Sequence, residues 1–298
     1  MREWKLDGGR FVEKRPVGGF GQRFHATPDD RTLIGGFYSF SLWEAAGLTR
    51  RTKPMDRRNS SPVPQVLSPD GRWLVRGGET PAVTVHDITC TEPRLHAALA
   101  ELDERTSVSS LALSPDGNFV AVAADQTNQR EPIRLFRVIE SALKPLAFPH
   151  ITGSQVRFSP DGRTLAVAGG QSVTLVELAN APTPRRPIEL GDGGWGSNLD
   201  VLFTPDGARV VTLRERTIGV WGVGDGKKIG QVEMPSVPVS VGLAPDGRHV
   251  AVGNPDGTVF VLRLRRLVRG IQAIPRHHAG PGGARSRSAW PLVRPGGS

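Results

Sequence analysis

The side chains best suited to acid–base or metal chemistry in this chain are its seven histidines. A metal or acid–base centre needs several such groups that converge on one point. Five of them stand alone in separate parts of the sequence, at His25, His86, His96, His150 and His249. The adjacent His277 and His278 lie in a stretch without the apolar pattern of a folded element. The histidines therefore predict no catalytic or metal site and no cofactor.

Three other segments resemble reactive or ligand-binding motifs only in part. Residues 222–228 are glycine-rich and end in two lysines, but they lack the spacing and the Ser or Thr of a phosphate-binding loop. Residues 192–194 and 254–257 contain acids or amides in stretches too short for a calcium loop. No Gly-x-Ser-x-Gly nucleophile elbow occurs. All three segments are interpreted as turns, and the chain is predicted not to be an enzyme.

Six of the sixteen aspartates stand at the third position of a recurring four-residue turn, of which Ser159-Pro160-Asp161-Gly162 is a clear copy. Proline restricts φ, aspartate caps its own backbone, and glycine adopts the left-handed conformation that reverses the chain. The turn prolines are Pro28, Pro69, Pro115, Pro160, Pro205 and Pro245, with spacings of 41, 46, 45, 45 and 40 residues. Each turn therefore predicts a hairpin, and the hairpin is repeated six times.

Short apolar runs flank each turn, as in residues 156–158 and 165–167, where apolar side chains alternate with polar or small ones. A repeat of this length with several short strands per copy is typical of propeller blades. We predict an all-β fold, a β-propeller of four-stranded antiparallel blades with six repeats plus an N-terminal half-blade. Residues 3–17 supply either the outer strand of copy six or the outer half of a seventh blade, so six and seven blades both remain open.

The ends of the third strands resemble those of the WD-repeat β-propeller family, over roughly residues 3–266. The family prefers Trp-Asp there; this chain has Trp4-Lys5, Trp43-Glu44, His86-Asp87, Phe136-Arg137, Val176-Glu177, Trp221-Gly222 and Leu262-Arg263. The family's Gly-His dipeptide is absent, so its His, Asp, Ser/Thr and Trp tetrad is complete in no copy. Repeats of periplasmic transport proteins share the turn but not these third strands, and they rank second. The resemblance implies a non-catalytic scaffold that mediates protein–protein interaction.

The formal net charge of +9 is concentrated at the C-terminal end. No acid follows Asp256, and the eight arginines beyond it account for +8, which leaves residues 1–256 at +1. We predict a propeller over residues 1–266 and a disordered Arg/Gly/Pro-rich tail over residues 267–298. One alternative function is nucleic-acid or anionic-surface binding through this tail, which unfolded charge would support at about 10⁻⁴ to 10⁻⁶ M. A tail without any role is the other interpretation.

The cysteine content and the lengths of the apolar runs indicate the cellular compartment. Cys90 is the single cysteine, so no intrachain disulfide forms. No apolar run reaches the ~18 residues of a membrane span, and the first residues lack the apolar stretch of a secretory signal. We therefore expect a cytoplasmic protein without a membrane span. The N-terminal half-blade suggests a segment of a larger multidomain protein.

A candidate interaction surface follows from strand topology. In an antiparallel meander, all Pro-Asp turns share one face of the ring, and the connections between strands two and three and between blades share the other. The long loop 125–131 and the Gly-rich loop 191–198 lie on that second face, in the neighbouring copies three, four and five. We predict a partner-binding patch of Gln126, Asn128, Arg130, Trp195 and Asn198. The alternatives are that Trp195 folds back over the rim without a partner, or that the propeller is an enzyme with an unrecognised channel site.

Overall fold

The computed structural model describes residues 2–265 apart from short gaps. The residues left out are 1, 8–9, 17–22, 28, 30, 37–39, 46–48, 53–63, 69, 78–82, 91, 100–105, 127–128, 140–141, 180, 191–198, 257 and 266–298. Every element of the described part is a β-strand. The predicted disorder of residues 267–298 lies outside the described residues.

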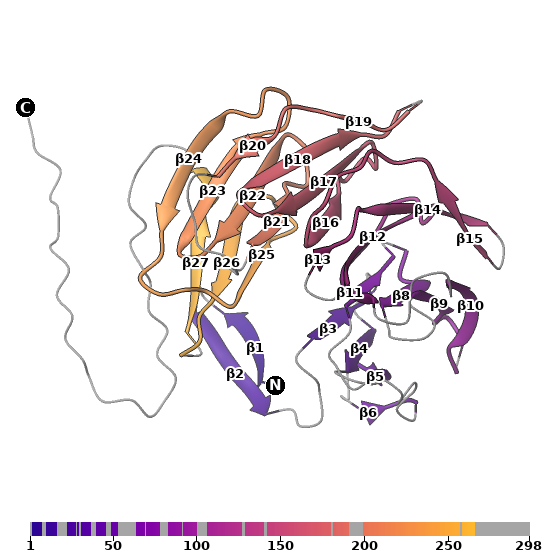
Figure 1. The fold of residues 1–298 in the computed structure, drawn as a ribbon. Coiled ribbons are helices and arrows are strands. Elements are labelled where there is room, and N and C mark those ends of the chain that lie inside the picture. The colour runs from indigo at the N-terminus through magenta and orange to yellow at the C-terminus, as the bar shows by residue number, and fades with distance from the viewer. Residues whose placement is uncertain are drawn as a thin grey trace, which may run out of the picture.

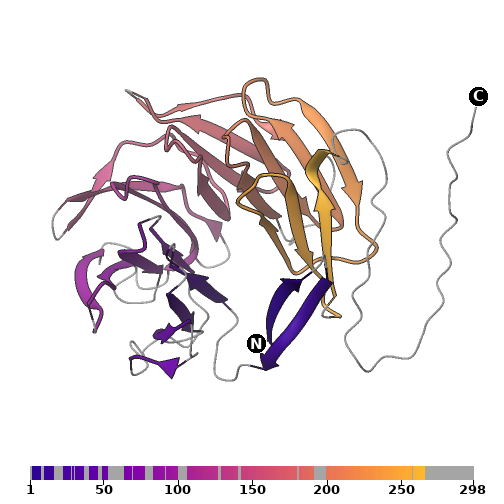
Figure 2. The ribbon, with the colours of Figure 1, turned by 180° about the vertical axis from the view of Figure 1, so that it is seen from behind.

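Six antiparallel blades are arranged around a ring in chain order (Figures 1 and 2). Blade one contains β3 (Arg23–Ala26), β4 (Thr32–Gly36), β5 (Phe40–Glu44) and β6 (Thr49–Arg50). Blade two contains β7 (Gln65–Leu67), β8 (Trp73–Gly77), β9 (Val83–Asp87) and β10 (Arg94–Leu99). Blade three contains β11 (Thr106–Leu113), β12 (Phe119–Gln126), β13 (Gln129–Arg130), β14 (Arg134–Ile139) and β15 (Ala142–Leu146).

The second half of the chain repeats this order. Blade four contains β16 (Gln155–Phe158), β17 (Thr164–Gly169), β18 (Ser172–Glu177), β19 (Thr183–Pro184) and β20 (Ile188–Glu189). Blade five contains β21 (Leu199–Phe203), β22 (Arg209–Arg214), β23 (Thr217–Gly222) and β24 (Lys228–Glu233). Blade six contains β25 (Ser240–Leu243), β26 (His249–Gly253) and β27 (Val259–Arg263). The predicted all-β propeller is therefore confirmed, with six blades.

The N-terminal half-blade is a separate two-stranded sheet. β1 (Arg2–Asp7) pairs with β2 (Arg10–Pro16) in antiparallel register. Figures 1 and 2 show this hairpin between blade six and blade one. Among the described strands, neither β1 nor β2 is paired with β27, the last strand of blade six.

A side-chain network stabilises five of the six Pro-Asp turns. In blade four, Ser159 Oγ donates to Asp161 Oδ1 at 2.6 Å, and the backbone N–H of Thr164 donates to Ser159 Oγ at 2.9 Å. The backbone N–H of Arg163 donates to the same carboxylate oxygen at 3.1 Å, and Gly162 has a φ of 71°. Serine and aspartate thus satisfy the backbone donors that the reversal leaves unpaired, and glycine supplies the left-handed residue.

The same network recurs around the ring with one exception. The hydroxyl-to-carboxylate pairs are Thr27 with Asp29, Ser68 with Asp70, Ser114 with Asp116 and Thr204 with Asp206. In blade six the first residue is Ala244, which has no hydroxyl. There Asp246 accepts a hydrogen bond from the backbone N–H of Arg248 at 2.8 Å and lies 3.0 Å from His249 Nδ1. The turn of blade six therefore keeps the backbone geometry of the repeat without the hydrogen bond from a hydroxyl to the aspartate.

These turn networks predict that the protein loses stability in acid. The hydrogen bond from Ser159 lowers the pKa of Asp161, and the one from Thr204 lowers the pKa of Asp206, each reinforced by a backbone N–H two residues on. A carboxyl with a depressed folded pKa stabilises the fold above its unfolded pKa of about 3.9 and loses that contribution as the pH falls through the folded value. We expect the urea midpoint to be flat near neutrality and to fall below about pH 4.

The variant Ser159→Ala with Thr204→Ala provides the control for this pH dependence. It lacks two of the hydroxyl donors, so its urea midpoint should fall less steeply over the same acid range. A wild-type midpoint that is unchanged from pH 6 to pH 3 would contradict the assignment.

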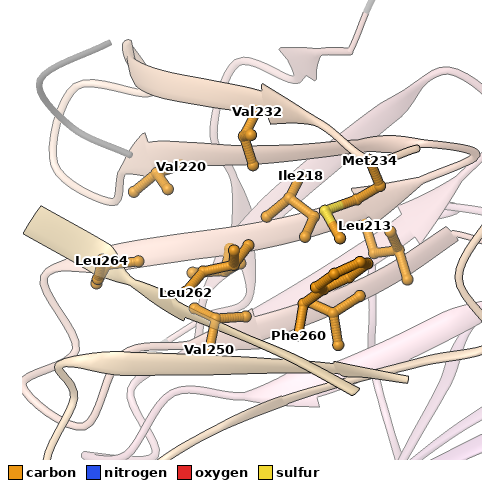
Figure 3. Close-up of a cluster of buried hydrophobic side chains, with 11 residues drawn as sticks. Leu213, Ile218, Val220, Val232, Met234, Val250, Phe260, Leu262 and Leu264 are labelled. Atoms are coloured by element: carbon orange, nitrogen blue, oxygen red, sulfur yellow. The ribbon is translucent and has the colours of Figure 1, made fainter. Parts of the chain in front are cut away.

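The core consists of clusters that each join two adjacent blades. Figure 3 shows the cluster between blades five and six, where side chains from β22 and β23 pack against those from β26 and β27. Its labelled members are Leu213, Ile218, Val220, Val232, Met234, Val250, Phe260, Leu262 and Leu264. Alanines on the second strands, such as the fully buried Ala166 and Ala168, contact the next blade and leave room for it to pack closely. No blade buries its apolar faces alone, so the blades stabilise one another.

Candidate functional site

The candidate surface is one face of the ring at blades three, four and five. It is formed by the connections from the second to the third strand of each blade and by the connections from one blade to the next. The innermost strands of these blades are β11, β16 and β21 (Figure 1), and polar side chains on them connect adjacent blades. Ser110 Oγ donates to Gln155 Oε1 at 3.1 Å, from blade three to blade four. Arg157 Nη2 lies 3.7 Å from Asp200 Oδ1, from blade four to blade five. We call Ser110, Gln155, Arg157 and Asp200 the inter-blade belt.

Backbone contacts hold the belt in place. The backbone N–H of Val156 donates to Ser110 Oγ at 3.3 Å, and Arg157 Nη1 donates to the carbonyl of Val156 at 3.1 Å. The backbone N–H of Val201 donates to Asp200 Oδ1 at 2.9 Å. These contacts link three blades by fixed polar groups, and about two-thirds of the Arg157 and Asp200 side chains is buried. The belt thus gives this face a pre-arranged polar centre with both hydrogen-bond donors and acceptors.

The predicted loop 125–131 is largely a β-hairpin at the rim of the same face. Gln126 pairs with Thr106 of β11 and with Gln129 of β13, and Asp125 pairs with Arg130. The backbone N–H of Glu131 donates to the carbonyl of Ala124 at 2.9 Å. The sequence predicts a loop here because this is the longest stretch between a second and a third strand. Pairing to an existing strand edge gives it the strand conformation instead.

Two of the five predicted patch residues lie in described strands. The backbones of Gln126 in β12 and Arg130 in β13 are held by the hairpin. Asn128, Trp195 and Asn198 lie outside the described residues. The structure therefore does not test whether the five side chains form one patch, and the patch stays a prediction.

The described residues of this face carry no arrangement typical of a metal centre. No group of three or more His, Cys, Asp or Glu side chains that could hold a metal ion occurs in the described part of the chain. The aspartates with a lowered pKa that belong to Pro-Asp turns, such as Asp161 and Asp206, lie at the opposite face. Their hydrogen bonds within the turns account for the shifts.

The sequence analysis did not predict the inter-blade belt, although the repeat contains a pattern that indicates part of it. The residue four positions before the first residue of the turn is polar in four consecutive copies, at Ser110, Gln155, Asp200 and Ser240. The residue that follows it is apolar in each copy. When the copies are aligned at their turns, the fourth residue before the turn is therefore a polar position, and the residue after it is a core position of the innermost strand.

Comparison with known proteins agrees with this architecture. Residues 98–128, which include β11 and β12, match the family described as WD domain, G-beta repeat. The structure is similar to that of Kuenenia stuttgartiensis hydrazine synthase, with a TM-score of 0.65 and 20% sequence identity, over 83% of this chain and 77% of that chain. At this identity the similarity shows the fold alone. Within the described residues, no helix is long and apolar enough to cross a bilayer.

Proposed function

We propose that this WD-repeat β-propeller is a non-catalytic cytoplasmic scaffold that binds a protein partner through the face carrying the inter-blade belt. The observation that carries the proposal is the hairpin of β12 and β13, which lies at the end of β12 away from the Pro-Asp turn. Gln126 is paired on both sides, to Thr106 and to Gln129. A pre-ordered surface loses less conformational entropy on binding than a loose loop, which favours affinity.

The proposed patch combines residue types that suit protein recognition. Arginine and tryptophan are enriched among the residues that dominate binding energy, so Arg130 and Trp195 are the proposed anchors. Gln126, Asn128 and Asn198 carry amides that both donate and accept hydrogen bonds. The belt at the centre adds further polar groups whose partners already fix their positions. Together these groups favour a polar, hydrogen-bonding protein surface as the partner.

Affinity capture tests the proposal directly. The bait is the full chain in nuclease-treated host lysate, compared with the double variant Arg130→Glu with Trp195→Ala. We expect the variant to lose at least about tenfold in recovery of a specific protein, since removing two anchors costs more than about 1.4 kcal/mol. Arg163→Glu, an exposed charge reversal beside a Pro-Asp turn on the other face, is the matched control and should retain that protein.

A second variant distinguishes binding by the propeller from binding by the basic C-terminal segment. Replacement of the arginines from Arg266 to Arg294 by glutamine removes the charge of the C-terminal segment and leaves the blades unchanged. Retention of the captured protein by this variant supports the proposal. Loss in this variant, with full retention by the Arg130→Glu and Trp195→Ala variant, would instead assign binding to the basic segment.

A further inference from the structure

The connection from blade five to blade six exposes apolar side chains on the same face of the ring as the strand two-to-three connections. It joins β24 to β25. Val237 and Val239 are 46% and 61% exposed, and Pro235 is exposed as well, whereas Met234 and Pro238 are buried. Three apolar residues at alternate positions are therefore open to solvent. Clustered exposed apolar side chains in a folded protein are typical of an interaction site.

Hydrogen bonds hold the backbone of this connection to a hairpin on each side. On the side of blade five, the backbone N–H of Met234 donates to the carbonyl of Arg216 at 2.6 Å, and Arg216 Nε donates to the carbonyl of Met234 at 2.8 Å. On the side of blade six, the backbone N–H of Val239 donates to the carbonyl of Gly253 at 2.9 Å. The connection is thus fixed before a partner binds, which reduces the conformational entropy lost on binding.

The exposed charged side chains around the connection are mainly acidic. Arg216 Nη2 lies 3.6 Å from Glu233 Oε1, and these two side chains are 47% and 70% exposed. Glu215 lies in the turn between β22 and β23, Asp256 lies in the turn between β26 and β27, and both are exposed. One cation and three anions give these four residues a formal net charge of −2. A basic partner segment complements this charge, whereas an acidic one is repelled.

Glu215 has a backbone conformation that favours glycine. Among the described residues it is the one non-glycine residue with a positive φ, of 49°. The equivalent turn of blade four has Gly170 at this position, ten residues after the Pro-Asp turn proline in both blades, with a φ of 60°. The left-handed conformation brings the Cβ of an L-residue too close to the following carbonyl, so the glutamate is strained there. Strain of this kind concentrates at functional sites, which supports a binding role for this acid.

We propose that these residues bind an extended basic segment of a partner protein. The binding surface consists of Pro235, Val237 and Val239, with Glu215 and Asp256 beside them. An aliphatic side chain of the segment packs on the valines, and flanking lysines or arginines face the acids. An extended segment fits because the exposed apolar residues recur at every second position, which is the side-chain period of an extended chain. The proposal rests on the scaffold function proposed above, to which it adds a second contact area and the chemistry of its partner.

Peptide selection on the purified full chain tests the partner chemistry. A phage library of random dodecapeptides is selected on the wild type, and the most enriched peptide is labelled and titrated by fluorescence anisotropy. We expect enriched sequences in which an aliphatic residue is flanked by lysine or arginine. No enrichment, or enrichment of acidic sequences, would overturn the proposal. The selection needs no partner from a lysate, so it can fail while the affinity capture described above succeeds, and the reverse.

Matched variants locate the binding surface. Val237→Ser should weaken binding of the selected peptide by at least about fivefold. Val261→Ser, which changes an equally exposed valine in β27, should leave the binding unchanged. Equal losses in the two variants would overturn the proposal. A wild-type dimer in sedimentation experiments that Val237→Ser abolishes would also overturn it, because a second copy of the chain would then cover the valines.

Glu215→Gly separates binding from a structural role of the acid. The variant should weaken peptide binding by at least about threefold, because the negative charge is lost. It should not lower the melting temperature, because glycine adopts this φ without a steric cost. Unchanged peptide binding, or a lowered melting temperature, would contradict the role assigned to Glu215.

Discussion

Substitution of Leu165 by alanine is expected to destabilise the propeller by about 2 to 5 kcal/mol. Leu165 lies in the second strand of blade four and is 0% exposed. It belongs to the cluster that joins blade three to blade four, with Val156, Val167 and Val176. The substitution removes buried methyl groups and leaves a cavity between two blades that neither can close. The measurement is the free energy of unfolding from urea titration.

Leu95→Ala is the matched control because it changes the same residue type at the surface. Leu95 lies in β10, the outer strand of blade two, and is 60% exposed. Its substitution should change the free energy of unfolding by no more than about 0.5 kcal/mol. Similar losses for the two variants would contradict the inter-blade core described here.

Substitution of Gly219 by alanine is expected to cost about 2 kcal/mol and to displace a tryptophan. A Cβ at Gly219 would lie 2.7 Å from Trp221 Nε1 and 2.9 Å from Thr212 Oγ1. Trp221 Nε1 donates to Thr212 Oγ1 at 3.0 Å, and Lys228 Nζ lies 5.8 Å from the centre of the indole ring. The rigid indole must move to admit the methyl group, so its hydrogen bond is lost. Unfolding free energy and the tryptophan emission spectrum both report the change.

Two comparisons make this prediction specific. Gly242→Ala, in the innermost strand of blade six, places its Cβ where nothing lies within 4 Å and should be neutral. In a Trp221→Leu background, Gly219→Ala should cost less, because the clash with the indole is removed and only the contact with Thr212 Oγ1 remains. An undiminished cost in that background would show that the indole is not the obstacle.

The repeat could be predicted from sequence because its signals are local. Each Pro-Asp turn carries its own conformational information in four residues, and the turn hydroxyls and aspartates meet within two residues of each other. Five of the seven predicted third-strand ends lie at the end of a strand, for example His86-Asp87 at the end of β9. Trp4-Lys5 and Phe136-Arg137 instead lie inside β1 and β14. Other strands depend on a neighbouring strand: β10 forms where the edge of β9 offers it backbone partners.

The parts that sequence reasoning missed depend on contacts between copies. Ser110 and Gln155 are 45 residues apart, so only the radial arrangement of the blades brings their side chains together. The hydrogen bond from Trp221 to Thr212 joins two strands, so it can be recognised only once β22 and β23 are paired. The hairpin of β12 and β13 depends on the edge of one strand and not on its own composition. Local patterns thus predict the blades, while the candidate site arises from packing between them.

Site-specific photocross-linking tests most directly the claim that one face of the propeller binds a partner. A benzophenone amino acid is placed at Arg130 on the rim hairpin, or at Arg163 beside a Pro-Asp turn on the opposite face, and each chain is irradiated in host lysate. We predict a cross-linked adduct of one defined protein from position 130 and none of that protein from position 163. Adducts of the same protein from position 163 alone, or from both positions equally, would contradict the account.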